Sequence, residues 1–418
     1  MVKVIVDEVT NRLRYTLDFI FVLRGVPYEL VMNTQDDHGE HVLNYSRENQ
    51  QSSLEVSSLL FEDDLRNVKL DLTAFNNEEC LAIDGIPDPI ATVFYILTRY
   101  EEYTGISEDE HGRFPFEESI LKKFNWIEKA MCDRLSIAIC GSIGVDVSPV
   151  AKVKLIPTFD IDNTFAYRLK YGMREFASKT RDVLSNNKER NKERKDVKKG
   201  GKDPYDTYEL IREIVQGNRD ARVFWLVGDW AKKDRNVSIK EPDHKTLINE
   251  MSKSVTIGVH PSYRSFQRKD VVEMEKLRIE KIINLEVINS RQHFLRFNLP
   301  QSYECLIESG IKHDYSMGFA ESVGFRCGTS RSFKWFNLQK NSETDLSIHP
   351  FVYMDGTLNE YMNLSIEESK VKINKLYNEV LSFGGDFIFV WHNETIGEYG
   401  KWKGWSEVLK HTLKLSNE

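Results

Sequence analysis

The chain has 418 residues, of which 40% are hydrophobic and 29% are charged, and it carries a formal net charge of -8 with a pI of about 5.8. This composition is typical of a soluble globular protein, and the length favours two domains. The acidic balance argues against a nucleic-acid-binding protein, which needs clustered positive charge. No apolar run approaches the roughly 20 residues of a membrane helix, so we expect no membrane span.

The five cysteines are odd in number and include no CxxC pair. A disulfide framework and a zinc ribbon are therefore not expected. Near the N-terminus, Asp7 and Glu8 stand where a signal peptide would need an apolar core. These features predict a cytoplasmic protein with reduced thiols, and the sequence gives no indication of its oligomeric state.

Residues 1–148 are predicted to form an N-terminal α/β domain of unknown role. Residues 17–31 combine strand-like residues with a glycine-containing turn. A helix is expected over residues 88–105, because Asp88 can cap it, Pro89 suits its first position and Gly105 follows its end. A second helix is expected over residues 125–140.

A basic run covers residues 188–202, "KERNKERKDVKKGGK", with eight basic and three acidic residues. Charge runs of this kind are usually solvated insertions. The alternative is a docking patch for a phosphate-bearing substrate.

Residues 149–418 are predicted to form the second domain, in which short β-rich runs alternate with helical segments. Alternation of this kind favours βα units and a parallel sheet. We therefore expect an α/β fold with a distorted (β/α) barrel of about seven parallel strands. The β-rich runs are residues 153–160, 221–229, 254–260 and 386–392, and helices are expected over residues 206–216 and 270–283.

The four β-rich runs share a polar residue at their ends: Asp160, Asp229, His260 and His392. A second acid, Asp162, follows the first. In a parallel barrel the C-terminal ends of the strands converge on one face, so these side chains could meet there. An aspartate at a strand end can also simply cap the next helix. Aspartate and histidine are nevertheless ligands that suit zinc and similar ions.

Five segments, in this order, resemble the motifs of the polysaccharide deacetylase family, the NodB-like group also called carbohydrate esterase family 4. The segments are "TFDID", "GVHPSY", "RQHFL", "LIESGIKHDYSMGF" and "FIFVWHNET". The resemblance covers roughly residues 150–418, and the first 150 residues resemble the N-terminal extension of a bacterial subset of the family. It implies a distorted (β/α) barrel that hydrolyses an amide with the help of a metal.

The resemblance also implies catalytic roles for individual residues. Asp160 would be the general base and Arg291 would orient it. His392 would be the general acid, with Asp314 nearby to tune it.

A divalent metal, expected to be Zn²⁺, would be bound by Asp162 and His260. The family's second motif normally supplies two histidines four residues apart, but Thr256 stands four residues before His260. His293 in "RQHFL" could supply the missing imidazole. The alternatives are that His293 is a structural residue, or that the site has lost its metal.

Three further residues are candidates for substrate contact: Tyr263, Arg326 and Trp391. For Arg326 the alternative is a buried ion pair, and for Trp391 it is packing in the core. Asp355 and His349 could line the cleft or belong to a structural turn.

The expected substrate is an N-acetylated sugar, and a cytoplasmic location favours a nucleotide- or lipid-linked precursor over a wall polysaccharide. Two alternatives remain open: an inactive, metal-poor barrel that binds glycans or acts as a scaffold, and a hydrolase of a small non-sugar amide.

Overall fold

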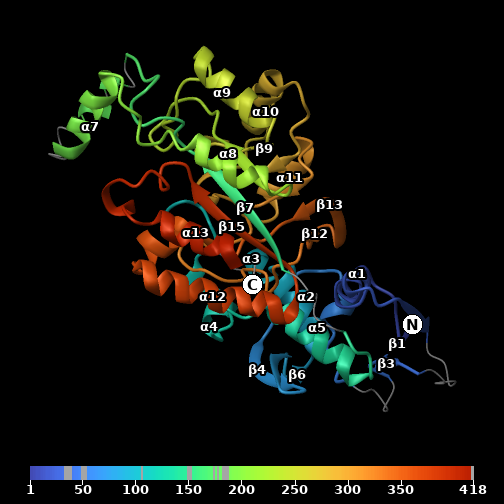
Figure 1. Cartoon of the computed structure of the whole chain (residues 1–418). Coiled ribbons are helices and arrows are strands. Elements are labelled where there is room, and N and C mark those ends of the chain that lie inside the picture. The colour runs from blue at the N-terminus through green and yellow to red at the C-terminus, as the bar shows by residue number, and fades with distance from the viewer. Residues whose placement is uncertain are drawn as a thin grey trace.

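The computed structural model of the chain is shown in Figure 1. It describes residues 1–32, 40–48, 54–104, 107–147, 153–172, 175–176, 178–180 and 188–415. The predicted domain boundary at residue 148 and the helix-ending Gly105 lie outside the described residues.

A nine-stranded sheet dominates the second half of the chain, in the order β12-β13-β11-β10-β9-β8-β7-β15-β14. Its central strand β7 is buried from Leu155 to Ile161, as expected for a parallel strand covered on both faces. The strands are β7 (Lys154–Ile161), β8 (Arg222–Trp225), β9 (Thr256–Val259), β10 (Asn289–Ser290), β11 (His313–Asp314), β12 (Phe333–Asn337), β13 (Ser342–Ile348), β14 (Tyr353–Met354) and β15 (Asp386–His392).

The predicted parallel sheet is confirmed, whereas a closed barrel is not formed by the strand pairs of the described residues. Strand β12 pairs antiparallel with β13 and forms one edge, and β14 forms the other. Only residues 349–352 connect β13 to β14, and such a segment spans at most about 17 Å. The sheet must therefore curl until its two ends lie close together. Pro350, which has no backbone N–H to donate, lies in the segment that bridges them.

Helices follow the strands of this sheet, as the predicted βα pattern requires. Helix α8 shows why they pack: its buried residues Tyr208, Ile211 and Val215 recur at helical spacing. In Figure 1, α8 to α11 gather at one end of the molecule and the N-terminal elements at the other. The helices of this half are α7 (Lys188–Lys198), α8 (Tyr208–Gln216), α9 (Pro242–Ser252), α10 (Lys269–Ile283), α11 (Gln301–Glu308), α12 (Ile366–Phe383) and α13 (Ser406–Lys414).

The N-terminal part contains two small sheets, one parallel (β2-β1-β3) and one antiparallel (β4-β5-β6). Part of the strand-like run in residues 17–31 belongs to a helix instead, because Leu13, Leu17 and Ile20 line one buried helical face. The elements are β1 (Val2–Val6), α1 (Asn11–Ile20), β2 (Tyr28–Met32), β3 (Val42–Tyr45), β4 (Leu70–Phe75), β5 (Glu78–Ile83), β6 (Ile86–Pro87), α2 (Pro89–Leu97), α3 (Glu101–Thr104), α4 (Ile120–Lys123) and α5 (Met131–Ser142).

The helix predicted after Asp88 begins as expected and is then interrupted. The Asp88 carboxylate accepts a hydrogen bond from the backbone N–H of Ala91, and Pro89 occupies the first turn. The helix ends at Leu97, and Arg99 adopts a left-handed conformation with φ of 56° before α3 begins. This break turns the Arg99 side chain toward Glu101 and Glu102, which form buried ion pairs with it.

The two parts of the chain share one hydrophobic core, which contains residues from β1 through α13. Polar contacts also cross between them: Arg326 makes a two-pronged ion pair with Glu102, with N–O distances of 2.8 and 3.0 Å. All five cysteines are free thiols. Among the helices that the structure describes, none combines the length and apolar character that crossing a bilayer requires.

Candidate metal centre

The carboxyl ends of neighbouring strands bring the predicted site residues together. Asp160 lies near the end of β7, and the parallel register places it beside His392 at the end of β15. His260 follows β9 directly, and Arg291 follows β10. Asp162 lies just beyond β7, so all five side chains lie at one edge of the sheet.

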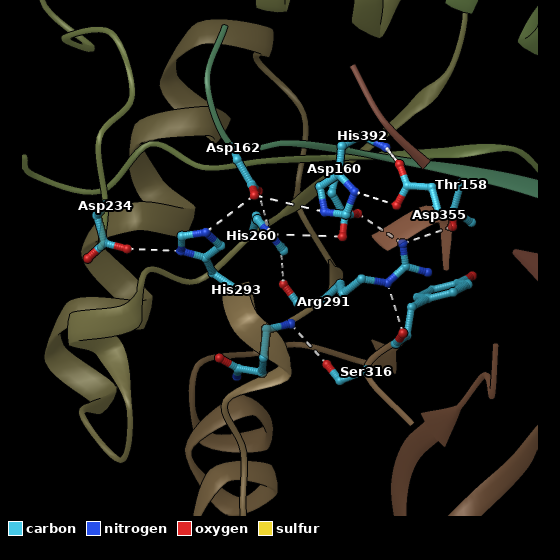
Figure 2. A network of polar contacts seen from close by, with 12 residues as sticks. Thr158, Asp160, Asp162, Asp234, His260, Arg291, His293, Ser316, Asp355 and His392 are labelled. Carbon is cyan, nitrogen blue, oxygen red and sulfur yellow. Dashed lines mark hydrogen bonds and ion pairs between the residues drawn. The ribbon is translucent and has the colours of Figure 1, made fainter. Parts of the chain in front are cut away.

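Asp162 is the centre of the cluster, and three histidines direct a ring nitrogen toward its carboxylate (Figure 2). The Nε2 atom of His260 lies 3.0 Å from Asp162 Oδ1. The Nε2 atoms of His293 and His392 lie 3.4 and 3.9 Å from Asp162 Oδ2. His293 and His260 are almost completely buried, so this is an enclosed group of ligand-type side chains.

The opposite ring nitrogen of each histidine is held by a hydrogen-bond acceptor. Nδ1 of His260 donates to the backbone carbonyl of Arg291 at 2.6 Å, and Nδ1 of His293 donates to Asp234 at 3.0 Å. Nδ1 of His392 donates to Asp355 at 2.8 Å. A neutral imidazole with its proton on Nδ1 presents a lone pair on Nε2, which is the arrangement that metal-binding histidines have in proteins.

The donor set formed by Asp162, His260 and His293 fits a divalent metal. Their ligand atoms all lie within 4.8 Å of one another, a separation that a bound cation with bonds of about 2.0 to 2.2 Å can draw together. Asp162 Oδ1 is buried and has no hydrogen-bond partner. The Nε2 atom of His260 lies 3.0 Å from it, while the opposite nitrogen of that ring donates to the Arg291 carbonyl. A cation between the two atoms would satisfy both lone pairs.

We expect metal affinity to increase with pH up to about pH 9. Burial alone would lower the pKa of His293, but the carboxylates of Asp162 and Asp234 outweigh burial and raise it to about 9. Below that pH the metal must displace a proton from the ring. The apparent Zn²⁺ association constant should therefore rise about tenfold per pH unit between about pH 7 and 9, in a competition titration with a chromophoric chelator. A constant affinity over that range would contradict the assignment of His293 as a ligand.

The predicted contact between Arg291 and Asp160 is confirmed. Arg291 is completely buried, and its Nη1 atom donates to Asp160 Oδ1 at 2.9 Å and to the Thr158 hydroxyl at 2.8 Å. Its Nε atom donates to the backbone carbonyl of Tyr315, and the guanidinium lies over the ring of Phe224. The arginine is therefore fixed on several sides and holds one oxygen of Asp160, leaving the other oxygen, Oδ2, facing His260.

His392 is paired with Asp355 and not with the predicted Asp314. Asp355 accepts hydrogen bonds from both Nδ1 and the backbone N–H of His392, each at 2.8 Å. Burial opposes a charge on His392, but Asp355 and Asp162 outweigh burial and raise its pKa well above the usual range. Asp314 instead accepts from the backbone N–H and the hydroxyl of Ser316, because the chain turns directly after the short strand β11.

A cleft of about 300 Å³ opens onto these residues. Asp160, Asp162 and the three histidines form its floor, and Phe294, Tyr361 and Trp402 are among the aromatic residues on its walls. One wall residue comes from the N-terminal part: Arg113, which donates to the carbonyl of Phe294 at 3.0 Å and pairs with Glu321 at 2.7 Å. The N-terminal part therefore contributes to the cleft, which the sequence did not indicate.

The predicted substrate contacts do not lie in this cleft. Arg326 is 2% exposed and is paired with Glu102, so the buried ion pair considered as its alternative is the observed state. Trp391 points away from His392 into the core, where its indole N–H donates to the Tyr353 hydroxyl. The ring of Tyr263 packs against the ring of Phe294, and the Tyr263 hydroxyl contacts His111 Nδ1 at 3.1 Å.

The expectation that Asp229 joins the other strand-end residues needs correction, and so does the significance given to Thr256. Asp229 lies four residues beyond the end of β8, is exposed and pairs with Arg278. Thr256 begins β9 and is exposed at the amino end of the strand, about 13 Å of chain away from His260. No residue at that position could reach the metal site, so Thr256 is not evidence that the metal has been lost.

The sequence did not indicate Asp234, which holds His293, because Asp234 lies in an irregular loop between β8 and α9 with no pattern around it. Asp355 was recognised only as a residue that could line the cleft. Its position directly after β14, a two-residue strand, could have been a signal if that strand had been recognised.

The site is thus an Asp-His-His group that could hold a metal ion, with a buried Asp–Arg pair and an Asp–His pair beside it, on an α/β fold. Residues 2–142 match a family of unknown function, DUF7033. A search of curated proteins found no match to the chain.

Several solved structures resemble the chain at low sequence identity. A proposed polysaccharide deacetylase from Mycobacterium smegmatis is 12% identical with a TM-score of 0.40, and the similarity covers 65% of this chain and 88% of that one. A polysaccharide deacetylase from Bacillus cereus is 12% identical with a TM-score of 0.30, covering 63% and 86%. A mutant of a CE4 family pseudoenzyme with restored activity is 11% identical with a TM-score of 0.30, covering 63% of each chain. At these low scores the likeness carries no conclusion about activity.

Proposed function

We propose that the chain is a metal-dependent hydrolase that removes the acetyl group from an N-acetylated sugar, with a nucleotide- or lipid-linked glycan precursor as the favoured substrate. The observation that carries the proposal is the convergence of the Nε2 atoms of His260, His293 and His392 on the partly buried carboxylate of Asp162. The metal assigned to Asp162, His260 and His293 would be Zn²⁺, because two imidazoles and a carboxylate are a common catalytic zinc set.

The residues beside the metal ligands supply the acid–base chemistry of amide hydrolysis. A divalent metal lowers the pKa of water and polarises an acyl oxygen. Asp160, oriented by Arg291, would accept the proton of the attacking water. His392, whose proton is stabilised by Asp355, would donate a proton to the departing amine. The two residues lie side by side in the register of strands β7 and β15.

The same geometry supports an active metal site over a metal-poor scaffold. Taking two imidazoles fully, and a third imidazole and a carboxylate partly, out of water costs free energy unless a partner compensates for the lost hydration. Each of the three histidines is held by an acceptor on its Nδ1 atom, which leaves its Nε2 atom available to a cation. The buried Asp162 Oδ1 atom has no hydrogen-bond partner, which supports a cation as its partner.

The proposal is tested by measuring acetate release from N-acetylglucosamine oligomers and from UDP-N-acetylglucosamine. Acetate release should disappear after treatment with a chelator and return when Zn²⁺ is added. Release that continues in fully chelated protein would exclude the metal mechanism. If neither substrate releases acetate from protein that contains stoichiometric metal, the deacetylase assignment is wrong.

A further inference from the structure

A second cavity of about 630 Å³ lies beside the catalytic cleft and is lined by basic side chains. Four cations line it: Lys170, Arg190, Lys232 and Arg235. They come from three segments that are distant in sequence, namely the loop after β7, helix α7 and the loop after β8. The chain as a whole carries a net charge of -8, so this cavity is a local reversal of the overall charge.

The cavity is directly adjacent to the catalytic residues. Glu394 lines both the cleft and the second cavity, and it lies two residues after His392. Asn163, which also lines the second cavity, immediately follows Asp162 and contacts the Lys170 ammonium at 3.2 Å. A ligand could therefore extend from the metal centre past Glu394 into the basic cavity.

Local contacts hold two of the cations in place. The Nε atom of Arg235 donates to the backbone carbonyl of Lys232 at 2.7 Å, which ties the two residues together in one turn. The Arg190 guanidinium lies over the ring of Tyr167 at 5.6 Å. Trp230, beside Lys232, exposes 41% of its surface and lines the same cavity.

We propose that this basic cavity binds the phosphate groups of a substrate whose acetylated sugar occupies the metal centre. The inference rests on the proposed function and deepens it, since it assigns the substrate to the class of phosphate- or diphosphate-linked acetamido sugars. Lysine and arginine are the usual partners of phosphate oxygens, and arginine can contact two of them at once. The exposed face of Trp230 offers a stacking surface to a nucleobase at the far end of a diphosphate.

Glu394 is placed to contact the sugar of such a substrate. It stands between the cation-lined cavity and the metal centre, and a carboxylate there can accept a hydrogen bond from a sugar hydroxyl.

The cavity volume also falls within the range of about 300 to 1,000 Å³ that is typical of small-molecule sites. The order of groups along the substrate would be acetamide, sugar, phosphate and carrier.

The chain offers a matched control for this proposal. A different hollow, between α9 and α10, is also lined by cations, among them Lys240, Lys245 and Lys281. It shares no lining residue with the catalytic cleft or with the basic cavity. Replacing Lys240 and Lys245 by glutamine removes the same charge as replacing Lys170 and Lys232, but it leaves the proposed phosphate site intact.

The experiment measures the binding of UDP, pyrophosphate and farnesyl diphosphate to the full-length protein by isothermal titration calorimetry. All three should bind, and the K170Q/K232Q variant should bind each about 10- to 100-fold more weakly, because each lost contact involves a charged group. The K240Q/K245Q variant should keep the original affinities. UDP binding more tightly than pyrophosphate would indicate a nucleotide carrier, and tighter binding of farnesyl diphosphate would indicate a lipid carrier.

Three results would overturn the inference: no detectable binding of pyrophosphate and UDP, equal losses of affinity in the two double variants, or unchanged affinity in K170Q/K232Q. The last result would mean that the phosphate groups bind to the metal and not to the basic cavity. UDP and pyrophosphate carry no acetyl group, so this test is independent of hydrolysis. Binding without acetate release from any substrate would contradict the proposed function and leave the phosphate site standing.

Discussion

Replacing His293 by alanine is expected to remove bound metal and the proposed deacetylase activity together. In the proposed site His293 would be one of three protein ligands, and Asp162 and His260 alone would hold the metal weakly. Losing even a residue behind a ligand typically costs 10- to 100-fold in metal affinity, so a lost ligand should cost more than about 100-fold. Metal content after dialysis and acetate release should fall in parallel, and H260A should behave in the same way.

His313 provides the matched control for this prediction. It is a partly buried histidine in β11 whose Nδ1 atom contacts His349 Nε2 at 2.9 Å, away from the metal centre. H313A should therefore keep its metal and its activity. Full metal occupancy and full activity in H293A would show that His293 is a structural residue and would leave the metal with a different third ligand.

Replacing Asp160 by asparagine is expected to abolish most of the activity while the metal stays bound. Asparagine retains an oxygen that can accept the hydrogen bond from Arg291, but it cannot take a proton from water. A general base typically contributes about 10² to 10⁴ in rate, so kcat should fall by that factor with little change in metal content. A thermal unfolding measurement shows whether the lost activity is instead caused by destabilisation of the variant.

The D314N variant is the control for this second prediction. Burial raises the pKa of Asp314 to about 6, so its carboxyl is partly neutral near pH 6. The single amide oxygen of an asparagine can still accept from the backbone N–H of Ser316, and only the hydrogen bond from the Ser316 hydroxyl is lost. We expect its activity to stay within a few fold of the original. If D160N kept a normal kcat, or if D314N lost activity as severely as D160N, the assignment of Asp160 as the base would fail.

Local sequence patterns correctly predicted the features that depend on neighbouring residues. Alternating β-rich and helical runs predicted the parallel sheet. Of the four strand-ending residues expected to meet, Asp160, His260 and His392 do so, and Asp229 does not. The start of helix α2 followed from Asp88 and Pro89, because capping is a contact between residues three positions apart.

The features that the sequence did not predict depend on contacts between distant segments. Asp234 reaches His293, and Asp355 reaches His392, only because loops from different parts of the chain meet above the sheet. Arg326 was mistaken for a substrate contact because its partner, Glu102, lies in the other half of the chain. The closure of the sheet also depends on how far the strands curl, which hydrophobic periodicity does not report.

The position of Arg113 in the cleft wall bears on how the two parts of this chain evolved. It belongs to the N-terminal part but forms part of the cleft wall, where it supports the backbone of Phe294 and pairs with Glu321. A recombination event that exchanged the first 147 residues for an unrelated module would change the shape of the pocket as well as the core. The two parts of the chain should therefore be inherited together, and substitutions at Arg113 should be accompanied by compensating changes at Glu321.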